Sequence, residues 1–131
     1  MKKILLDTSA YTEFLSGNDK VFDILGQADT VFMSIFVLGE LFYGFRGGKK
    51  EVKNKELLSR FLEKPTVTII SAGQETAEIF GFVKHELKKN GTPIPINDVW
   101  IASHTIETGA TLISFDTHFK KVAGLRVWDY L

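Results

Sequence analysis

The chain has 131 residues, enough for one domain that buries roughly two-thirds of the surface of its unfolded form. It contains no cysteine, which excludes disulfides and thiolate metal sites and fits a reducing compartment, with the cytoplasm as the default. Sixteen basic and sixteen acidic residues balance, so any contact with nucleic acid must come from a local patch of charge. We therefore expect a single domain over residues 1–131.

Short apolar runs rich in β-branched residues predict five strands. They lie at residues 3–6, 30–34, 66–70, 111–114 and 125–128. The first run ends at Asp7, too early for the hydrophobic core of a signal peptide or for a membrane span. We therefore read it as a buried strand and expect no membrane association.

Segments long enough for helices separate the strands. They cover residues 9–15 and 20–28, then 35–45 and 49–63, then 72–89, and finally 98–108. Ser71 is the expected cap of the helix at 72–89, which should stop at Asn90 and Gly91, and Asn97 is available to cap the last helix. Strands and helices alternate, which predicts an α/β fold: a three-layer α/β/α sandwich on a mostly parallel sheet.

Acidic residues stand where the strands end or where the following helices begin. Asp7, Asp98 and Asp116 occupy such positions, so parallel strands would bring them to one edge of the sheet, where α/β folds bind ligands. Helix capping explains each of them singly, because Asp is a favoured cap. Asp98 also shares the sheet-facing side of its helix with Ile101 and Thr105, which favours a role in chemistry.

Glu40 is the single charge in the apolar segment SIFVLGELFYGF, residues 34–45. A buried carboxylate needs a cation or hydrogen-bond donors, and the segment contains no lysine or arginine. Either Glu40 lies on a solvated edge of its helix, or it reaches the sheet edge where the aspartates gather. In the second case four carboxylates converge, and a divalent cation would relieve their repulsion. Oxygen ligands of this kind suit Mg²⁺ or Mn²⁺.

Four motifs in chain order, LLDTSAY, LGELFYG, INDVWIA and LISFDTHF, resemble those of the PIN domain nucleases. The small size is similar to that of VapC-type toxins of bacterial and archaeal toxin-antitoxin pairs. The resemblance spans nearly the whole chain and implies a metal-dependent endoribonuclease. In such an enzyme, water activated by one or two Mg²⁺ or Mn²⁺ ions attacks RNA and leaves a 5′-phosphate and a 3′-hydroxyl.

The resemblance also assigns roles to single residues. Asp7 and Asp98 would be the main metal ligands, and Glu40 and Asp116 would hold the metal directly or through water. Thr8 and Ser114 would hydrogen-bond to the waters or ligands of the site. The family usually has threonine where this chain has Ser114, a change that keeps the hydroxyl.

Partners follow from the same resemblance: an RNA substrate, an antitoxin that places a basic side chain near the acids, and a second copy in a homodimer. Arg46 and Lys49 are candidates for RNA contact, although a solvated helix face explains this basic run equally well. His118, beside Asp116, is a further candidate, although such a histidine is more often structural. His85 and His104 lack partners at ligand spacing and are expected at the surface or its boundary.

Three other classes of protein share parts of this pattern. A phosphoacceptor receiver domain needs an acidic pair after the first strand, where Asp7 stands alone, and a lysine after the last, where Asp129 follows. A haloacid-dehalogenase-type phosphatase needs a second Asp at the position of Ser9. A non-catalytic module that uses the acids to bind a metal or a basic partner stays open.

Overall fold

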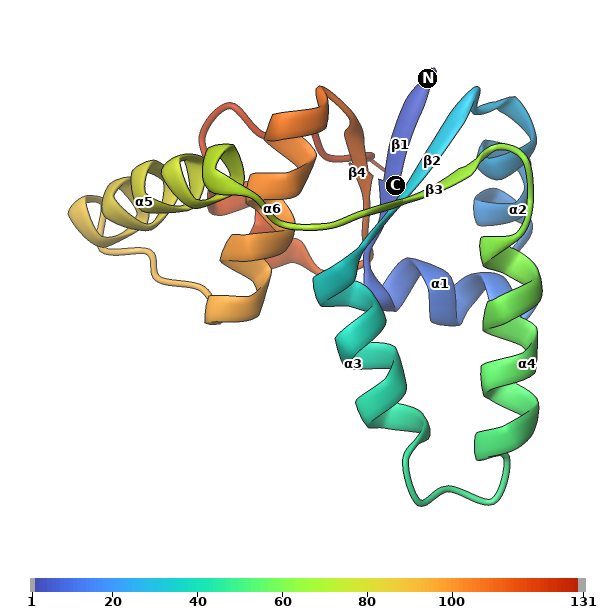
Figure 1. The fold of residues 1–131 in the computed structure, drawn as a ribbon. Helices are drawn as coiled ribbons and strands as arrows, with labels where there is room; N and C mark the ends of the chain where they lie inside the picture. The colour runs from blue at the N-terminus through green and yellow to red at the C-terminus, as the bar shows by residue number, and fades with distance from the viewer. Residues whose placement is uncertain (1, 130–131) are drawn as a thin grey trace.

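The computed structural model describes residues 2–129, and within them a single parallel sheet runs through the centre of the molecule (Figure 1). Its strands are β1 (Lys3–Leu6), β2 (Thr30–Ser34), β3 (Val67–Ile70) and β4 (Thr111–Ile113), in the order β3-β2-β1-β4. In the register of the sheet, Ile4 of the central strand pairs with Val31 on one side and with Thr111 on the other. The predicted parallel sheet is confirmed.

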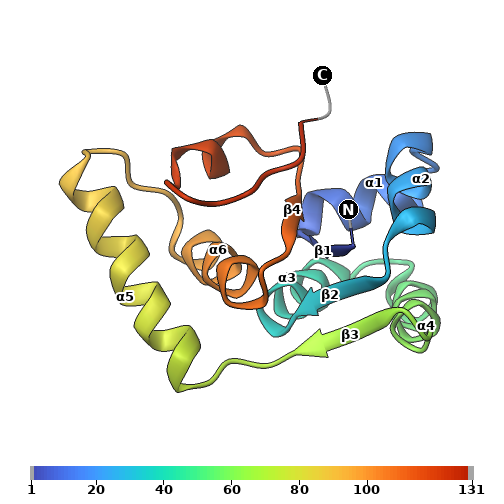
Figure 2. The same cartoon turned by 90° about the horizontal axis from the view of Figure 1, so that it is seen from above.

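Helices cover both faces of this sheet. They are α1 (Thr8–Leu15), α2 (Asp19–Gln27), α3 (Ile35–Phe45), α4 (Glu51–Leu62), α5 (Gln74–Lys89), α6 (Ile96–Thr108) and a 3₁₀ helix, η1 (Thr117–Lys121). Helix α6 lies against one face with α5 outside it, and α1, α2 and α4 lie on the other side (Figure 2). The predicted three-layer sandwich is therefore confirmed. No helix within residues 2–129 is long and apolar enough to cross a bilayer.

The segment at residues 125–128 is not the predicted fifth strand. It forms one bridge, in which the Leu112 N–H donates to the Arg126 carbonyl and the Trp128 N–H donates to the Leu112 carbonyl, each at 2.8 Å. In a parallel pair, alternate residues bond to a given neighbour, and β4 has three residues. Leu112 is therefore the one residue of β4 that directs both backbone groups at this segment.

Helix α5 begins later than the sequence predicts. Its cap is Gly73 and not Ser71, and the Gly73 N–H donates to the Thr76 hydroxyl at 3.0 Å. This hydrogen bond satisfies the backbone N–H of the cap residue itself. The helix ends as predicted, with Asn90 as its cap and Gly91 in the left-handed conformation (φ 69°).

Helix α6 begins earlier than the sequence predicts, with Pro95 as its cap in place of Asn97. The Pro95 carbonyl accepts hydrogen bonds from the N–H groups of Asp98 (3.0 Å) and Val99 (3.2 Å). Asn97 and Asp98 therefore both lie inside the first turn. Since Asp98 does not cap the helix, capping does not account for its carboxylate.

Stacked aromatic rings join the helices that carry two of the acids. Trp100 of α6 stacks on Phe36 of α3, with ring centroids 5.1 Å apart, and on Phe80 of α5, with centroids 3.8 Å apart. Such ring pairs add to the stabilisation that burial alone supplies. The column fixes α3, with Glu40, against α6, with Asp98.

Candidate active site

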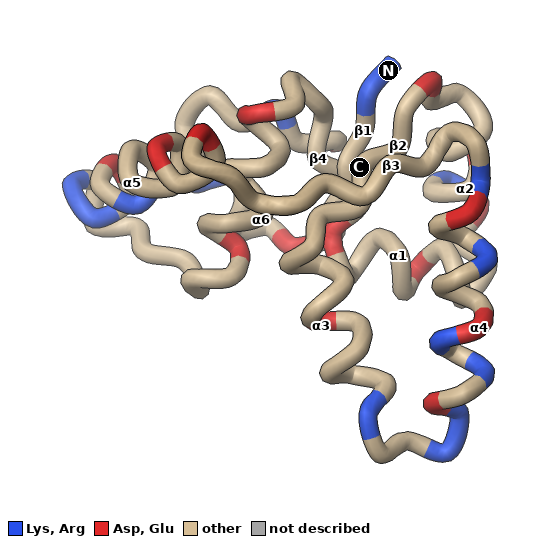
Figure 3. Tube along the Cα trace, in the orientation of Figure 1, with Lys and Arg blue, Asp and Glu red and all other residues tan. Residues whose placement is uncertain are grey.

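The four predicted acids come from four places along the carboxyl edge of the sheet. Asp7 follows β1 and caps α1, Asp116 follows β4 and caps η1, and Glu40 and Asp98 belong to α3 and α6. Figure 3 shows acidic positions along the inner corner between α6 and α3, with the turn from α3 to α4 projecting beyond them. The candidate active site is therefore the corner between α6 and α3.

Asp7 is the most enclosed of the four, with 4% of its surface exposed. Its Oδ1 accepts hydrogen bonds from the Ser9 hydroxyl (2.7 Å) and the Ala10 N–H (2.8 Å), and its Oδ2 accepts one from the Ser114 hydroxyl (2.5 Å). Burial raises the pKa of Asp7, the three hydrogen bonds oppose that rise, and the charge of Asp98 adds to it. The carboxylate is therefore held in one orientation close to a second acid.

The hydroxyls of Ser9 and Ser114 each donate to Asp7 and each accept from a backbone N–H of the segment after β4. Ser9 donates to Asp7 and accepts from the Phe115 N–H at 3.0 Å, while Ser114 donates to Asp7 and accepts from the Asp116 N–H at 2.9 Å. The two hydroxyls thereby join the turn after β1 to the turn after β4. Ser114 was predicted to support the site, whereas the part played by Ser9 was missed. Its place two residues after Asp7, where a hydroxyl reaches back to a capping carboxylate, is the signal that could have found it.

Glu40 is half-buried, and the Thr8 hydroxyl donates to its Oε1 at 2.6 Å. The carboxylate borders an open hollow of about 350 Å³ lined by Ile35, Phe36, Gly39, Tyr43 and Asn97. Glu40 therefore does not sit inside a closed apolar wall. Thr8 and the hollow account for a charge in this segment, and Glu40 lies near enough to Asp98 to raise the pKa of that residue.

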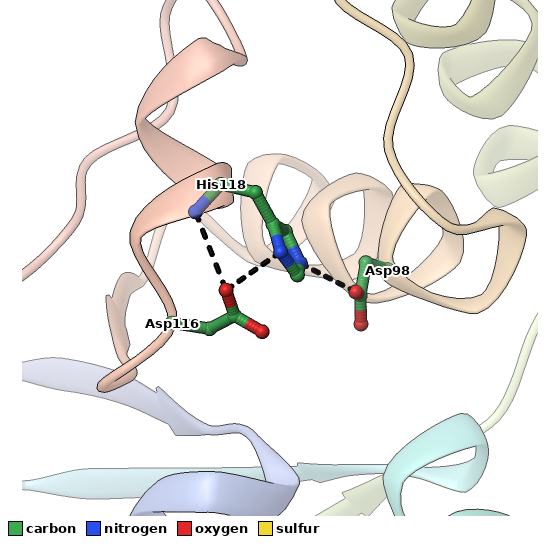
Figure 4. Close-up of side chains that lie close together, drawn as sticks. All are labelled: Asp98, Asp116 and His118. Carbon is green, nitrogen blue, oxygen red and sulfur yellow. Dashed lines mark hydrogen bonds and ion pairs between the residues drawn. The ribbon is translucent and has the colours of Figure 1, made fainter.

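Asp98, Asp116 and His118 form the tightest group of potential ligands within residues 2–129 (Figure 4). His118 Nε2 lies 2.5 Å from Asp98 Oδ2, and His118 Nδ1 lies 2.6 Å from Asp116 Oδ1. The Asp116 carboxylate also accepts from the His118 backbone N–H at 3.3 Å. One ligand atom from each residue falls within 4.8 Å of the other two, and neither Asp7 nor Glu40 belongs to this set.

The electrostatics of Asp98 link all four acids. Burial raises the pKa of Asp98, the hydrogen bond and charge of His118 lower it, and the charges of Glu40 and Asp116 raise it again. Asp98 in turn raises the pKa of Asp7. Like charges disfavour ionisation of one another, so a site of this kind gains from a cation. The expectation that the acids gather at one edge agrees with these effects.

The remaining candidates for RNA contact occupy different surroundings. Arg46 and Lys49 are exposed on the turn between α3 and α4, away from the sheet. His118 differs from them, because both of its ring nitrogens already face carboxylates of the site. The sequence shows that His118 lies two residues after Asp116, but its contact with Asp98 could not be predicted from the sequence.

Comparisons with known proteins agree with this arrangement. Residues 4–125 match the model of the PIN domain family. The chain is 34% identical over 110 residues to ribonuclease VapC2 of Rickettsia felis, covering 82% of this chain and 81% of that protein. It is 29% identical over 136 residues to ribonuclease VapC2 of Haemophilus influenzae, covering 100% of both. VapBC2 from Rickettsia felis, solved bound to a DNA fragment from its promoter, contains a chain with a TM-score of 0.85 and 30% identity, covering 97% of this chain and 99% of that one. The chain belongs to the PIN domain family.

Proposed function

We propose that this chain is a metal-dependent endoribonuclease that acts as the toxin of a toxin-antitoxin pair. The observation that carries the proposal is the group of acids at the carboxyl edge of the sheet, where Asp98 couples electrostatically to the other three. Relatives at 34% and 29% identity carry the name ribonuclease, and a close structural neighbour is part of a VapBC complex. These similarities support the reaction class and the toxin role together.

The donor set suits Mg²⁺ or Mn²⁺, because it consists of carboxylate and hydroxyl oxygens with one imidazole and no thiol. Asp98 and Asp116 would hold the first ion together with Asp7, and Glu40 would hold it through water or help to hold a second. A divalent ion held by these residues would supply a bound water of lowered pKa and would offset negative charge on the phosphate oxygens. The ring of His118 lies between two of these carboxylates, with one nitrogen against each.

The chain's own residues fix the geometry. Ser9, Ser114 and the Ala10 N–H orient the Asp7 carboxylate, and Thr8 orients Glu40. Such supporting hydrogen bonds matter because ligand orientation governs both metal affinity and rate. Attack by water needs no side chain as nucleophile; it would leave 5′-phosphate and 3′-hydroxyl ends and would not need the RNA 2′-hydroxyl.

Substrate and partner would share the corner between α6 and α3. An RNA strand would run past the acids toward the basic turn with Arg46 and Lys49, which would contact its phosphates. A cognate antitoxin would block the site by placing a basic side chain among the acids, and the toxin would be a homodimer. The lack of cysteine fits action in the cytoplasm.

Cleavage of a mixed cellular RNA pool by the purified chain with Mg²⁺ or Mn²⁺ tests this function. We expect cuts bearing 5′-phosphates that vanish with EDTA and fall by more than about 100-fold in Asp7→Asn, since supporting changes alone cost 10–100-fold. Asparagine also caps helices, so α1 should persist in that variant. The control is Asp23→Asn, an exposed acid of α2.

Two results would count against the enzyme. Equal cleavage by Asp7→Asn would point to a contaminating nuclease. Binding of Mn²⁺ in calorimetry with no cleavage of any RNA would favour the non-catalytic module, which keeps the acids for metal or partner binding.

A further inference from the structure

The ring of His118 fills the space between two carboxylates of the site. Its two nitrogens face different acids: Nε2 lies 2.5 Å from Asp98 Oδ2, and Nδ1 lies 2.6 Å from Asp116 Oδ1 (Figure 4). A single metal ion can bind one nitrogen of an imidazole, so the ring in this position does not join the two acids to a common ion. It lies between the two acids, in contact with one oxygen of each.

Both contacts occupy carboxylate oxygens. Each ring nitrogen lies within hydrogen-bond distance of one of them, and which partner carries the hydrogen depends on the tautomer of the ring. A cation held by Asp98 and Asp116 needs the same oxygens, at about 2.0–2.1 Å for Mg²⁺. The ring and the cation therefore compete for the same two oxygen atoms.

We propose that His118 clamps Asp98 and Asp116 together while no cation is bound, and that its side chain leaves both acids when a divalent cation binds between them. The inference rests on the proposed metal-dependent function. It makes His118 a positioning residue, which keeps two acids side by side against their mutual repulsion, and neither a permanent ligand nor an RNA contact.

The surroundings of His118 allow this exchange. Its side chain is 23% exposed and that of Asp116 is 43% exposed, so the ring has a path toward solvent. The backbone of η1 is anchored by the next residue, Phe119, which is 1% exposed and belongs to the core. A rotation of one side chain on a fixed helix is therefore enough to open the site.

Calorimetric titration with Mn²⁺ alone tests the clamp. In His118→Ala we expect Mn²⁺ to bind roughly tenfold more tightly than in the unchanged protein, because the contacts of the ring with the two carboxylate oxygens no longer have to be broken. His118→Gln, which keeps a single donor group, the side-chain amide, should show a smaller gain and serves as the second variant if alanine impairs folding. The control is His85→Ala, an exposed histidine of α5, whose affinity should not change.

The outcomes separate the clamp from its alternatives. Weaker binding in both His118 variants would make His118 a ligand and overturn the proposal, and unchanged binding would overturn it as well. In those cases Mn²⁺ still binds, so the proposed function is untouched. Absence of Mn²⁺ binding in the unchanged protein and in every variant would remove the metal-dependent function together with the clamp.

Nuclear magnetic resonance of the ring nitrogens gives a second readout that does not use activity. The chain has three histidines, so His118 can be assigned from its variants, with His85 and His104 as internal references. Saturation with Mg²⁺ should shift the two ring nitrogens of His118, as both lose their carboxylate partners, and leave those of His85 in place. A His118 ring that keeps its resonances at saturating Mg²⁺ contradicts the clamp.

Discussion

The hydroxyl of Ser114 donates a hydrogen bond to Asp7 Oδ2 at 2.5 Å and so joins two residues that are 107 positions apart in the chain. The same oxygen accepts from the Asp116 N–H at 2.9 Å. One buried hydroxyl thus orients the carboxylate after β1 and fixes the backbone of the acid after β4. Among the hydroxyls that orient the acids, we therefore expect removal of the Ser114 hydroxyl to lower activity most.

Ser114→Ala should lower RNA cleavage by about 10–100-fold, the usual cost of removing a hydrogen bond that orients a metal ligand. Among the effects that hold down the pKa of Asp7, the Ser114 hydrogen bond is the largest, so its loss also favours protonation of that ligand. Ser114→Thr keeps the hydroxyl and should retain most activity. Initial rates of cleavage at saturating Mg²⁺ measure both.

A matched control for Ser114 lies in α6. Ser103 is also fully buried, but its hydroxyl donates to the Val99 carbonyl of its own helix at 2.7 Å and contacts none of the acids. Ser103→Ala should therefore leave cleavage unchanged. If both alanine variants lost activity equally, the loss would reflect the creation of a small cavity and not the orientation of Asp7.

The double substitution of Arg46 and Lys49 by alanine should weaken RNA binding uniformly across sequences. Each phosphate contact contributes about 0.7 to the slope of log affinity against log salt for a single strand, so we expect the slope to fall by about 1.4. Binding of a labelled RNA to the Asp7→Asn protein over a series of salt concentrations measures this without cleavage.

The control for this basic turn lies at the opposite edge of the sheet. Lys2 and Lys3 precede and begin β1, at the end of the sheet away from the acids. Their replacement by alanine should leave the salt slope unchanged. An equal effect of both double substitutions would mean that RNA does not follow the corner between α6 and α3.

The layers of the fold, and the edge of the sheet on which the acids gather, could be predicted from the sequence. Alternation of strands and helices predicts parallel crossovers, and parallel strands place their carboxyl ends together, so Asp7 and Asp116 were expected at the same edge of the sheet. That they follow adjacent strands is known only from the strand order of the structure. Asp98 followed from the buried side of its helix. These predictions depended on chain order and periodicity, which a sequence shows directly.

Contacts set by side-chain rotamers could not be predicted. His118 meets Asp98 across 20 positions because η1 and the first turn of α6 face each other, a relation that neither segment encodes alone. The starts of α5 and α6 were misplaced for a similar reason, since Gly73 and Pro95 cap them through backbone geometry and not through a capping side chain. Local patterns specify elements more firmly than they specify how the elements meet.

His104 was expected at the surface or its boundary, and this was wrong, because the residue is 0% exposed. Helix α6 lies between the sheet and α5, so it is buried on more than one side. The Ser34 hydroxyl lies 2.7 Å from His104 Nδ1, and the ring packs on Phe36 at 5.3 Å. His104 is therefore a buried ring with a hydrogen-bond partner, and not the surface residue that its polar side chain suggested.

This burial makes stability depend on pH. Burial lowers the pKa of His104, against opposing effects of Glu107 and the Ser71 backbone. As the pH falls through about 6.5, His104 binds a proton in the unfolded chain but not yet in the folded chain. The contribution of this residue to the free energy of unfolding is therefore fully present above that pH and is lost as the pH falls below it. Between pH 7.5 and 5.5 this loss of the free energy of unfolding has a ceiling of about 1.4 kcal/mol, reached if the folded ring takes up no proton.

Urea unfolding at the two pH values measures the effect as a difference between proteins. His104→Asn should lack that part of the pH dependence, whatever its own stability, because asparagine does not titrate. His85→Asn, at an exposed position of α5, should retain it. If the His104→Asn protein lost as much stability on acidification as the unchanged one, the ring would take up its proton as readily in the folded chain as in the unfolded one.

Tyr11 offers a change that should not weaken the fold. The side chain is 0% exposed and packs against Phe61, with ring centroids 5.4 Å apart, and burial raises the pKa of its hydroxyl to about 12. Within residues 2–129 that hydroxyl has no hydrogen-bond partner. A buried polar group in this state costs about 1–3 kcal/mol, so Tyr11→Phe should leave the free energy of unfolding unchanged or raise it by about 1 kcal/mol.

Urea unfolding measures this free energy in Tyr11→Phe and in a control, Tyr43→Phe, at a position that is 85% exposed and should not respond. A loss of more than about 1 kcal/mol in Tyr11→Phe alone would mean that the hydroxyl is satisfied, for instance by a bound water, and that it helps to hold α1 beneath the Asp7 cap.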